Sequence, residues 1–263
     1  MTYSGKTAWV IGASSGIGAE LCSQLAKKGA RVILSARNEG KLAEVKATLL
    51  NSDQHLVFPI DLENTEDIIS KVETLLNEVG EIHFLYNNGG LSQRSTAHDT
   101  QLNVDRKIME INYFGNIAIS KALLPQMRKQ GGGTIVVISS IAGKFGFFLR
   151  SAYSASKHAL HGFYESLRLE EEANNIKVNI ICPGKINTDI SKHALTESGE
   201  AHGVMDHNQA TGMSVETCVK SILKAVKKNK FETLIGGKET KAVFLKRFFP
   251  KLFYKIIKKQ SAV

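Results

Sequence analysis

The amino-acid sequence predicts an α/β fold in which one parallel sheet is covered by helices on both faces. The first observation is a series of short apolar runs rich in β-branched residues, the composition of strands buried on both sides. The second is that amphipathic segments with helical spacing separate these runs, and such alternation produces right-handed βαβ units. The predicted strands lie within residues 7–12, 30–36, 55–61, 82–87, 133–140, 177–183 and 231–237, and the predicted helices within 18–29, 39–51, 65–80 and 214–229.

Length and composition are those of one ordinary globular domain. The 263 residues, 43% hydrophobic and 22% charged, fit a single large α/β unit. The first ten residues lack the pattern of a signal peptide, and no apolar stretch reaches the ~18 residues of a membrane span. Cys22, Cys182 and Cys218 are widely spaced and form no metal-type cluster. We therefore expect a cytoplasmic protein with reduced thiols and no metal site.

The net charge of +9 comes mainly from the end of the chain. Residues 238–263 contain eight Lys or Arg and one acidic residue, a net charge of +7, whereas residues 1–237 carry only +2. A nearly neutral body argues against nucleic-acid binding. We therefore divide the chain into a main domain, residues 1–237, and a basic tail, residues 238–263.

A glycine-rich segment follows the first predicted strand directly. In GASSGIGAE, residues 12–20, Gly12, Gly16 and Gly18 permit a tight turn and a close approach of the backbone to a pyrophosphate. The helix that follows offers free N–H groups and a favourable dipole at its N-terminus. A glycine triplet also occurs in purely structural turns, but the strand before it and the helix after it favour a dinucleotide site.

The segment SAYSASKHALHGF, residues 151–163, places Tyr153 and Lys157 one helical turn apart on the same face. An ammonium in that position lowers the pKa of a phenol, which can then exchange a proton near neutral pH. Tyr254 and Lys258 repeat the spacing, but they lie in the basic tail without a preceding strand and serine. We therefore assign the chemistry to Tyr153 and Lys157.

The G-x-x-x-G-x-G spacing and the Tyr/Lys pair together resemble the classical short-chain dehydrogenase/reductase family. Residues 89–95 and 143–160 resemble its hydroxysteroid-dehydrogenase-like branch with membrane-associated dehydrogenase/reductases. The resemblance covers about residues 5 to 235. It implies a three-layer, doubly wound Rossmann fold whose seven-stranded parallel sheet has the order 3-2-1-4-5-6-7. It also implies an oxidoreductase that interconverts a carbonyl and an alcohol, assembled as a homodimer or homotetramer.

The same resemblance implies a catalytic tetrad of Asn112, Ser140, Tyr153 and Lys157. Ser140 has the family's spacing to Tyr153, and Asn112 in MEINYFG matches the family's helix asparagine. Tyr153 would give the proton to the carbonyl oxygen, or take it back in the oxidation direction. Ser140 would hold that oxygen in place. Lys157 would lower the pKa of Tyr153 and grip the nicotinamide ribose, and Asn112 would hold a water that links Lys157 to solvent.

The end of the second predicted strand bears on the choice of cofactor. It carries Ser35, Arg37 and Asn38 but no acidic residue. A guanidinium there pairs with a 2′-phosphate through its fork of donors, which predicts NADP(H) over NAD(H) unless Arg37 is merely a solvated surface residue. The other cofactor-binding residues that the resemblance implies are Gly12, Ser14, Ser15, Gly16, Ile17, Gly18, Asp61, Leu62, Asn88, Gly89, Tyr153, Lys157, Pro183, Gly184, Ile186 and Thr188.

Two segments bear on the substrate and on partners. The polar stretch near 190–213 matches the family's substrate loop, and Phe145, Phe147, Phe148 and Leu149 indicate either an apolar substrate or core packing. In the tail, apolar residues at helical spacing lie opposite lysines, and Pro250 should break or kink the helix. This pattern fits an interfacial helix on an anionic membrane, and it also fits a helix that packs on its own subunit or on another.

A different functional class remains open at this stage. The protein could be a catalytically idle NADP(H)-binding adaptor at a membrane surface. The intact tetrad argues against this, since an idle site has no physical need for Tyr153 and Lys157 together.

Overall fold

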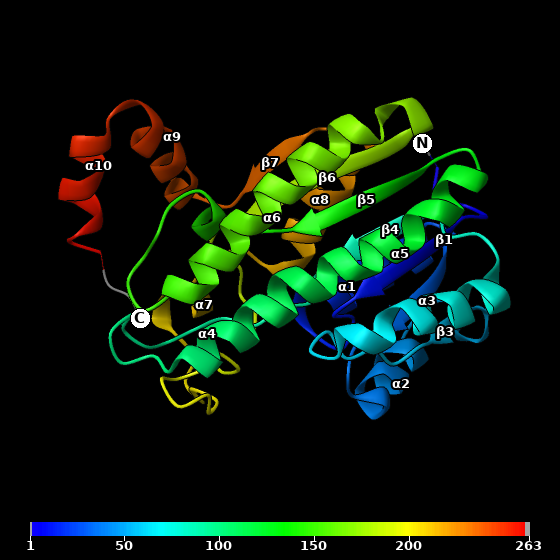
Figure 1. Cartoon of the computed structure of the whole chain (residues 1–263), viewed down its shortest axis with the longest axis horizontal. Coiled ribbons are helices and arrows are strands. Elements are labelled where there is room, and N and C mark those ends of the chain that lie inside the picture. The colour runs from blue at the N-terminus through cyan, green and yellow to red at the C-terminus, as the bar shows by residue number, and fades with distance from the viewer. Residues whose placement is uncertain (1, 261–263) are drawn as a thin grey trace.

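The computed structural model describes residues 2–260. Its centre is a seven-stranded parallel sheet of order β3-β2-β1-β4-β5-β6-β7 (Figure 1), so the predicted Rossmann arrangement is confirmed. The strands are β1 (Thr7–Ile11), β2 (Arg31–Ser35), β3 (Leu56–Val57), β4 (Phe84–Asn87), β5 (Gly133–Ile138), β6 (Ile176–Pro183) and β7 (Glu232–Ile235). The helices are α1 (Gly16–Lys27), α2 (Glu39–Ala47), α3 (Thr65–Val79), α4 (Leu102–Met109), α5 (Gly115–Lys129), α6 (Ser151–Glu170), α7 (His207–Ala210), α8 (Val215–Lys227), α9 (Lys241–Phe248) and α10 (Pro250–Ile257).

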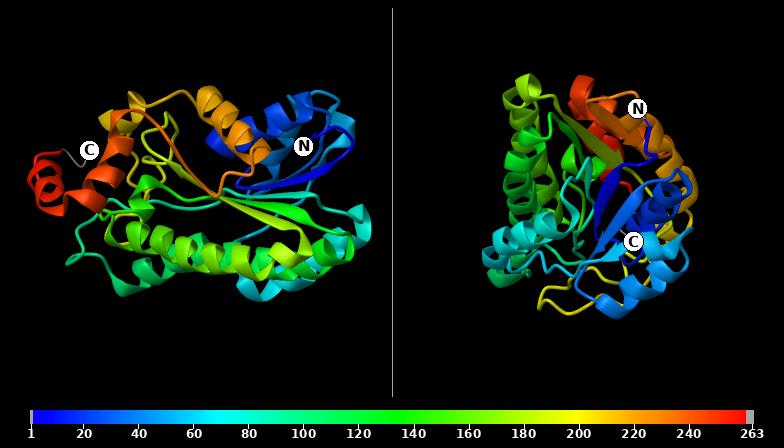
Figure 2. Two further views of the ribbon diagram at one scale, coloured as in Figure 1. Left: turned by 90° about the horizontal axis from the view of Figure 1, so that it is seen from above. Right: turned by 90° about the vertical axis from the view of Figure 1, so that its right-hand side faces the viewer.

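Two helical layers bury the two faces of the sheet (Figure 2). Strand β1 shows how the sequence produces them, because successive side chains of a strand point to opposite faces. Ala8 and Val10 join the apolar cluster formed with α1, α2 and α8. Trp9 and Ile11 join the cluster formed with α3, α5 and α6. Strand β1 therefore buries apolar side chains on both of its faces, as the sequence indicated.

The third predicted strand, residues 55–61, is much shorter in the structure than expected. It lies at the edge of the sheet, and only Leu56–Val57 has regular strand geometry. Phe58 and Ile60, on either side of Pro59, face β2, so the missing N–H of Pro59 lies on the free edge of the sheet, where proline is tolerated. Beyond Val57, two separate backbone hydrogen bonds continue the pairing with β2. They run from Phe58 N to Leu34 O (2.9 Å) and from Ile60 N to Ala36 O (3.2 Å).

A π-helical turn, Glu110–Phe114, separates α4 from α5 and contains Asn112. The wider turn leaves backbone carbonyls without their usual helical partners. The Asn116 amide donates to the carbonyls of Ile111 (3.1 Å) and Asn112 (3.0 Å) and so stabilises the turn. Such turns occur often at functional sites, and this one directs the Asn112 side chain toward α6.

The basic tail forms a short 3₁₀ turn, Lys238–Thr240, followed by α9 and α10. Pro250 is the first residue of α10, where its missing N–H costs nothing, so the predicted break at this proline is confirmed. Figures 1 and 2 show both helices at one end of the molecule, beyond the carboxyl ends of the strands. Within residues 2–260, no helix has the combined length and apolar character needed to cross a membrane.

Candidate active site

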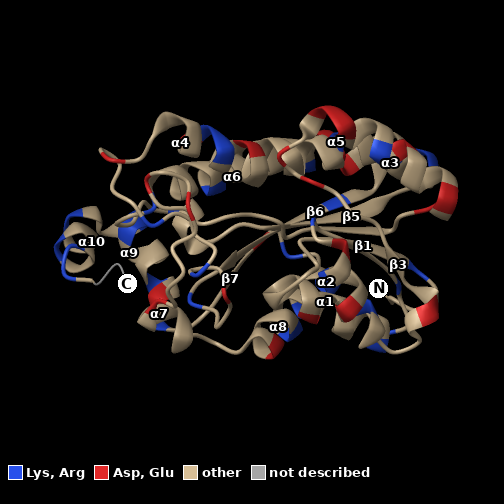
Figure 3. Cartoon of the chain, turned by 90° about the horizontal axis from the view of Figure 1, so that it is seen from below, with Lys and Arg blue, Asp and Glu red and all other residues tan. Residues whose placement is uncertain are grey.

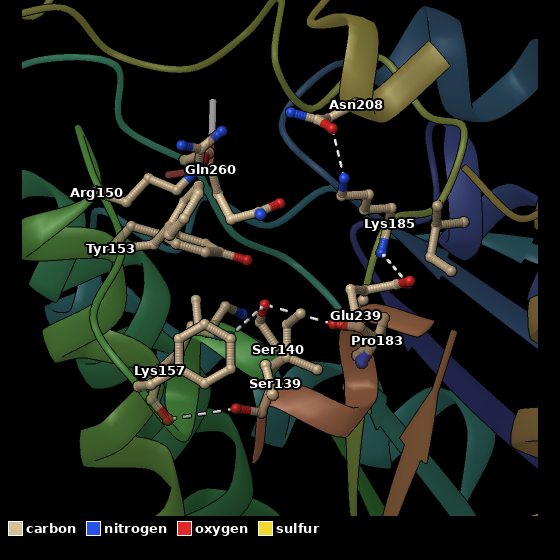
Figure 4. Close-up of a pocket in the computed structure, with 18 of the residues that line it drawn as sticks. Ser139, Ser140, Arg150, Tyr153, Lys157, Pro183, Lys185, Asn208, Glu239 and Gln260 are labelled. Atoms are coloured by element: carbon tan, nitrogen blue, oxygen red, sulfur yellow. Dashed lines mark hydrogen bonds between the residues drawn. The ribbon is translucent and has the colours of Figure 1, made fainter. Parts of the chain in front are cut away.

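A cavity of about 870 Å³ opens at the carboxyl ends of the strands, the edge at which open parallel sheets bind ligands. Figure 4 shows Tyr153, Ser140 and Lys157 around its inner part. The walls combine segments far apart in the sequence: Ile17 of α1, Asn88 and Gly90 after β4, Ser140 after β5, Tyr153 and Lys157 of α6, Pro183–Ile186 after β6, and side chains of α9 and α10.

Tyr153 and Ser140 meet at the base of this cavity. Tyr153 lies in the first turn of α6, is only 8% exposed, and directs its hydroxyl into the cavity (Figure 4). Ser140 follows β5; its hydroxyl accepts from Ala142 N (3.1 Å) and donates to Pro183 O (3.5 Å). The Tyr153 and Ser140 side chains, the two groups that would contact a carbonyl oxygen, therefore line the same cavity.

Burial raises the pKa of Tyr153, against the expected lowering by Lys157. The nearby Ser140 hydroxyl and the guanidiniums of Arg150 and Arg94 oppose this rise in pKa by favouring the phenolate. The cations that act on the phenol in the structure are thus two arginines that the sequence analysis did not single out. The assignment of pKa tuning to Lys157 alone needs correction on this point.

Lys157 is buried on α6, one turn after Tyr153, with its ammonium 5.8 Å from the centre of the Tyr153 ring. The Nζ atom donates to Ile138 O at the end of β5 (2.9 Å). Burial lowers the pKa of Lys157 to about 8, and the neighbouring Cys182 partly offsets that effect. Ser139, the residue before Ser140, donates to the carbonyl of Lys157 (3.3 Å).

Asn112 lies beside Lys157 and is fully buried. Its Oδ1 accepts from Leu91 N (2.7 Å), and its Nδ2 donates to Leu91 O and Ser156 Oγ (both 2.9 Å). Gly90 allows this approach: a Cβ there would lie 2.9 Å from Asn112 Oδ1 and 3.5 Å from Lys157 Nζ. The structure thus brings all four tetrad residues together, with the Asn112 amide already tying the π-turn to the loop after β4.

The glycine loop forms a cradle that side chains would fill. Gly12 and Gly16 have left-handed backbones, with φ of +75° and +52°. A Cβ on Gly12 would lie 2.8 Å from Gly89 Cα, and a Cβ on Gly18 only 1.9 Å from Gly12 O. Asn88 donates to that same carbonyl (3.1 Å). Ser14, Ser15 and Ile17 complete the turn into the N-terminus of α1, so the loop fits the pyrophosphate of a dinucleotide.

The three residues predicted to bind the cofactor at the end of β2 have different surroundings. Ser35 is fully buried: its hydroxyl accepts from Trp9 Nε1 (2.8 Å) and donates to Phe58 O (2.5 Å), so its side chain holds the core together and does not line the cavity. Asn38 caps α2 by accepting from Lys41 N (2.9 Å). Arg37 is exposed and makes no ion pair with any other residue of the described range 2–260.

The residues after β3 and β4 form the adjacent wall. Asp61 accepts from Glu63 N (3.0 Å) and is half-buried, whereas Leu62 belongs to the core. Gly89 packs closely on this wall, because a Cβ there would lie 2.6 Å from Leu62 Cδ1. Asn88 borders the cavity itself.

Pro183–Thr188 forms the opposite wall, and Glu239 of the tail supports it. The Glu239 carboxylate accepts from Lys185 N (3.0 Å) and Gly237 N (2.9 Å) (Figure 4). Gln209 donates to Ile186 O (2.6 Å) and lies 3.4 Å from Thr188 Oγ1. Neither Glu239 nor Gln209 could be identified from motif spacing, because each reaches this wall from a distant part of the chain.

A buried ion cluster fixes the predicted substrate loop. Asp206 accepts from Arg94 Nε (2.9 Å) and from the Arg150 guanidinium (3.0 Å). The Arg94 and Asp206 side chains are only 2% and 1% exposed. Arg94 N also donates to Leu195 O (2.8 Å), so the loop is attached at two points. These contacts therefore attach the segment near 190–213 to Arg94 and Arg150.

Gln93 is a further residue that the sequence pattern did not indicate. It is fully buried, and its Oε1 accepts from Ala152 N (2.8 Å) and Tyr153 N (3.4 Å) at the start of α6. These N–H groups have no helical acceptor of their own. Gln93 therefore positions the turn that carries Tyr153.

Behind the site, His161, Cys182 and Glu232 form a group of potential metal ligands. His161 Nε2 lies 3.7 Å from Cys182 Sγ, while its other nitrogen lies 3.4 Å from Glu232. Lys144 also pairs with Glu232 (2.7 Å), so the carboxylate already has a cationic partner. All three cysteines are buried free thiols, as expected.

The tail forms the outer wall of the cavity. Phe253 of α10 is buried edge-on against Phe145, with ring centres 5.3 Å apart. Phe145 and Phe147 line the cavity, whereas Phe148 is exposed. Tyr254 is also exposed and does not line the cavity, so the second Tyr/Lys pair stands apart from the site.

Comparisons with known proteins agree with this geometry. A model of the short chain dehydrogenase family matches residues 6–199. A dehydrogenase/reductase SDR family protein 7-like from Anopheles gambiae is 40% identical over 264 residues, covering 98% of this chain and 83% of the relative. The dehydrogenase/reductase SDR family member 7B of Mus musculus is 41% identical over 254 residues, covering 94% and 79%.

Solved structures show the same fold. A short chain dehydrogenase/reductase from Burkholderia phymatum, in complex with NAD, superimposes with a TM-score of 0.83 at 22% identity and covers 96% of each chain. A short chain dehydrogenase from Burkholderia cenocepacia, in complex with NADP, superimposes with a TM-score of 0.82 at 24% identity, covering 99% of this chain and all of the other.

Proposed function

Because the chain belongs to the short-chain dehydrogenase/reductase family of oxidoreductases, we propose that it interconverts an apolar carbonyl compound and its alcohol with NADP(H). The observation that carries the proposal is that Tyr153 and Ser140 line one cavity beside a glycine cradle that fits a dinucleotide. The bound nicotinamide would supply or accept the hydride.

Tyr153 acts as the proton donor in the reduction direction and as the base in oxidation. Its hydroxyl is directed into the cavity, and Ser140 beside it donates to the substrate oxygen as negative charge develops there. The Ser140 hydroxyl and the guanidiniums of Arg150 and Arg94 favour the phenolate that forms when the proton leaves. The buried Lys157 holds positive charge below pH of about 8 and would hydrogen-bond to the nicotinamide ribose of a bound cofactor.

Arg37 supports the choice of NADP(H). Gly12 N and Ala13 N both donate to Ser35 O, at 2.7 and 3.0 Å, so the chain two residues beyond Ser35 lies next to the glycine loop. An exposed guanidinium at that place is available to a 2′-phosphate, and no acidic side chain from 35 to 38 competes for it.

The cavity supports an apolar substrate. Phe145, Phe147 and the side chains of α9 and α10 line its outer half, whereas the polar groups gather near Tyr153. A ligand with one carbonyl or hydroxyl group on an apolar body matches this division.

Titration with NADPH and with NADH, followed by nicotinamide fluorescence, tests the cofactor assignment. We expect tighter binding of NADPH, and Arg37→Ala should weaken NADPH binding while leaving NADH binding unchanged. Equal binding of the two cofactors by the natural protein would contradict the role of Arg37.

Turnover of apolar ketones and aldehydes tests the reaction. Tyr153→Phe should lower turnover by about 10²–10⁴-fold and retain cofactor binding. Cofactor binding without turnover in the natural protein, and no effect of Tyr153→Phe, would favour the idle adaptor.

The homodimer or homotetramer and the cytoplasmic location remain predictions, which sedimentation and cell fractionation would test.

A further inference from the structure

The two C-terminal helices expose an unusual concentration of large apolar side chains. Of the fourteen large apolar side chains exposed within residues 2–260, six lie between 244 and 256. Phe248 and Phe249 are the most exposed of the six, at 68% and 63%. Single exposed apolar residues are common on soluble proteins, but a cluster of this size marks a contact surface. The six are Phe244, Phe248, Phe249, Leu252, Tyr254 and Ile256.

The charge of this surface has one sign. Between 240 and 260 the chain has no acidic residue, and Figure 3 shows Lys and Arg on α10 without Asp or Glu. Cations that border exposed apolar side chains match a surface with negative headgroups above an apolar layer. A second copy of the same basic surface would bring like charges together. The cations are Lys241, Lys246, Arg247, Lys251, Lys255, Lys258 and Lys259.

Contacts with the main domain fix which side of the tail faces outward. Phe253 is buried against Phe145, and Lys246 Nζ donates to Lys144 O (2.8 Å). At the start of the tail, Glu239 is bonded to Lys185 N (3.0 Å). These three points hold the tail against the domain, so the exposed apolar side chains of α9 and α10 lie around the outer part of the cavity.

The exposed surface is also the mouth of the cavity. Phe244, Phe248, Phe249 and Ile256 line the cavity and are exposed to solvent at the same time. An apolar ligand that leaves the cavity by this side meets apolar side chains along its path. A bilayer placed against α9 and α10 would make that path continuous with its acyl region.

We propose that α9 and α10 dock on an anionic lipid bilayer and turn the mouth of the cavity toward it, so that the apolar substrate enters from the lipid phase. The docking step rests on the exposed surface alone, and the entry step rests on the proposed function. Vesicle binding and turnover therefore test them separately.

Flotation of the whole protein with vesicles tests docking. We expect binding to vesicles of phosphatidylcholine with phosphatidylglycerol, weaker binding to phosphatidylcholine alone, and loss of binding at high salt. Lys251→Glu with Lys255→Glu should weaken binding to the anionic vesicles at least tenfold. The matched control is Lys224→Glu with Lys227→Glu on α8, which makes the same charge change on another exposed helix and should have little effect.

Fluorescence tests the depth of contact. Tryptophan placed by Phe249→Trp should shift to the blue with anionic vesicles and be quenched by brominated lipid. Leu169→Trp, at a 75% exposed position on α6, should show neither change. Equal behaviour of the two variants would overturn docking through this surface. Absence of vesicle binding, with self-association that Phe248→Ser abolishes, would assign the surface to a second copy instead.

Turnover tests entry from the lipid phase. Lys251 and Lys255 do not line the cavity, so Lys251→Glu with Lys255→Glu should leave the turnover of a short water-soluble carbonyl unchanged. The same variant should raise the apparent KM for a carbonyl dissolved in anionic vesicles several-fold. An unchanged KM in the variant that no longer binds vesicles would overturn entry from the bilayer and leave the oxidoreductase assignment standing.

Discussion

The Glu239 carboxylate accepts a hydrogen bond from the backbone N–H of Lys185 at 3.0 Å, so the first turn of the tail supports the wall formed after β6. Gly184 and Gly236 make room for it, because a Cβ on either would lie within 2.5 Å of Glu239 Oε1. Burial raises the pKa of this carboxyl, but the N–H donors of Lys185 and Gly237 outweigh burial and the net pKa is lowered. Glu239 therefore remains ionised at neutral pH and acts as a positioning residue.

Glu239→Ala should weaken nicotinamide cofactor binding several-fold and lower the melting temperature, because two backbone donors lose a charged acceptor. Glu239→Gln retains an oxygen acceptor and should restore most of both properties. Cofactor titration and thermal unfolding of the three proteins would measure this. Equal cofactor affinity in all of them would show that the contact is dispensable.

Lys157→Met should abolish turnover and change how stability depends on pH. The pKa of Lys157 is lowered from 10.5 to about 8 by burial, so the unfolded chain binds more protons than the folded chain between these values. The contribution of Lys157 to the free energy of unfolding therefore rises with pH across this window. Denaturant unfolding from pH 7.5 to 10 should show the natural protein gaining stability relative to Lys157→Met. A difference between the two that is independent of pH would contradict the lowered pKa.

Asp206→Ala should destabilise the protein by about 3–5 kcal/mol, since it leaves the buried Arg94 without its carboxylate. Asp189→Ala is the matched control in the same loop. It removes an ion pair to Lys192 whose two side chains are largely exposed, and should change stability by less than about 1 kcal/mol. Chemical denaturation of both variants measures the contrast. A small effect of Asp206→Ala would mean that the loop is not held by this cluster.

Gly18→Ala should abolish cofactor binding and destabilise the domain, because the new Cβ would lie 1.9 Å from Gly12 O. The comparison is Gly162→Ala in α6, where the Cβ meets no atom within 4 Å. That change should stabilise the protein by about 0.5–1 kcal/mol, since alanine favours a helix over glycine. NADPH titration and thermal unfolding distinguish the two. Retained NADPH binding in Gly18→Ala would contradict the cradle.

The sequence by itself determined the sheet, its parallel pairing and the break at Pro250, because these follow from local periodicity and from the missing N–H of proline. It also placed Tyr153 and Lys157 on one helical face, a relationship that a spacing of four residues fixes. It overestimated the length of β3, where position at the sheet edge decided the outcome.

Only the tertiary structure decided which charges surround the phenol and what the tail covers. Asp206 is 112 residues from Arg94, and Glu239 is 54 residues from Lys185. No periodic pattern predicts contacts between residues so far apart in the sequence, because the packing of the whole chain decides which groups pair with a buried charge. The same packing buries the Ser35 side chain in the core. It also buries Phe253 and leaves Phe248 and Phe249 exposed at the mouth of the cavity.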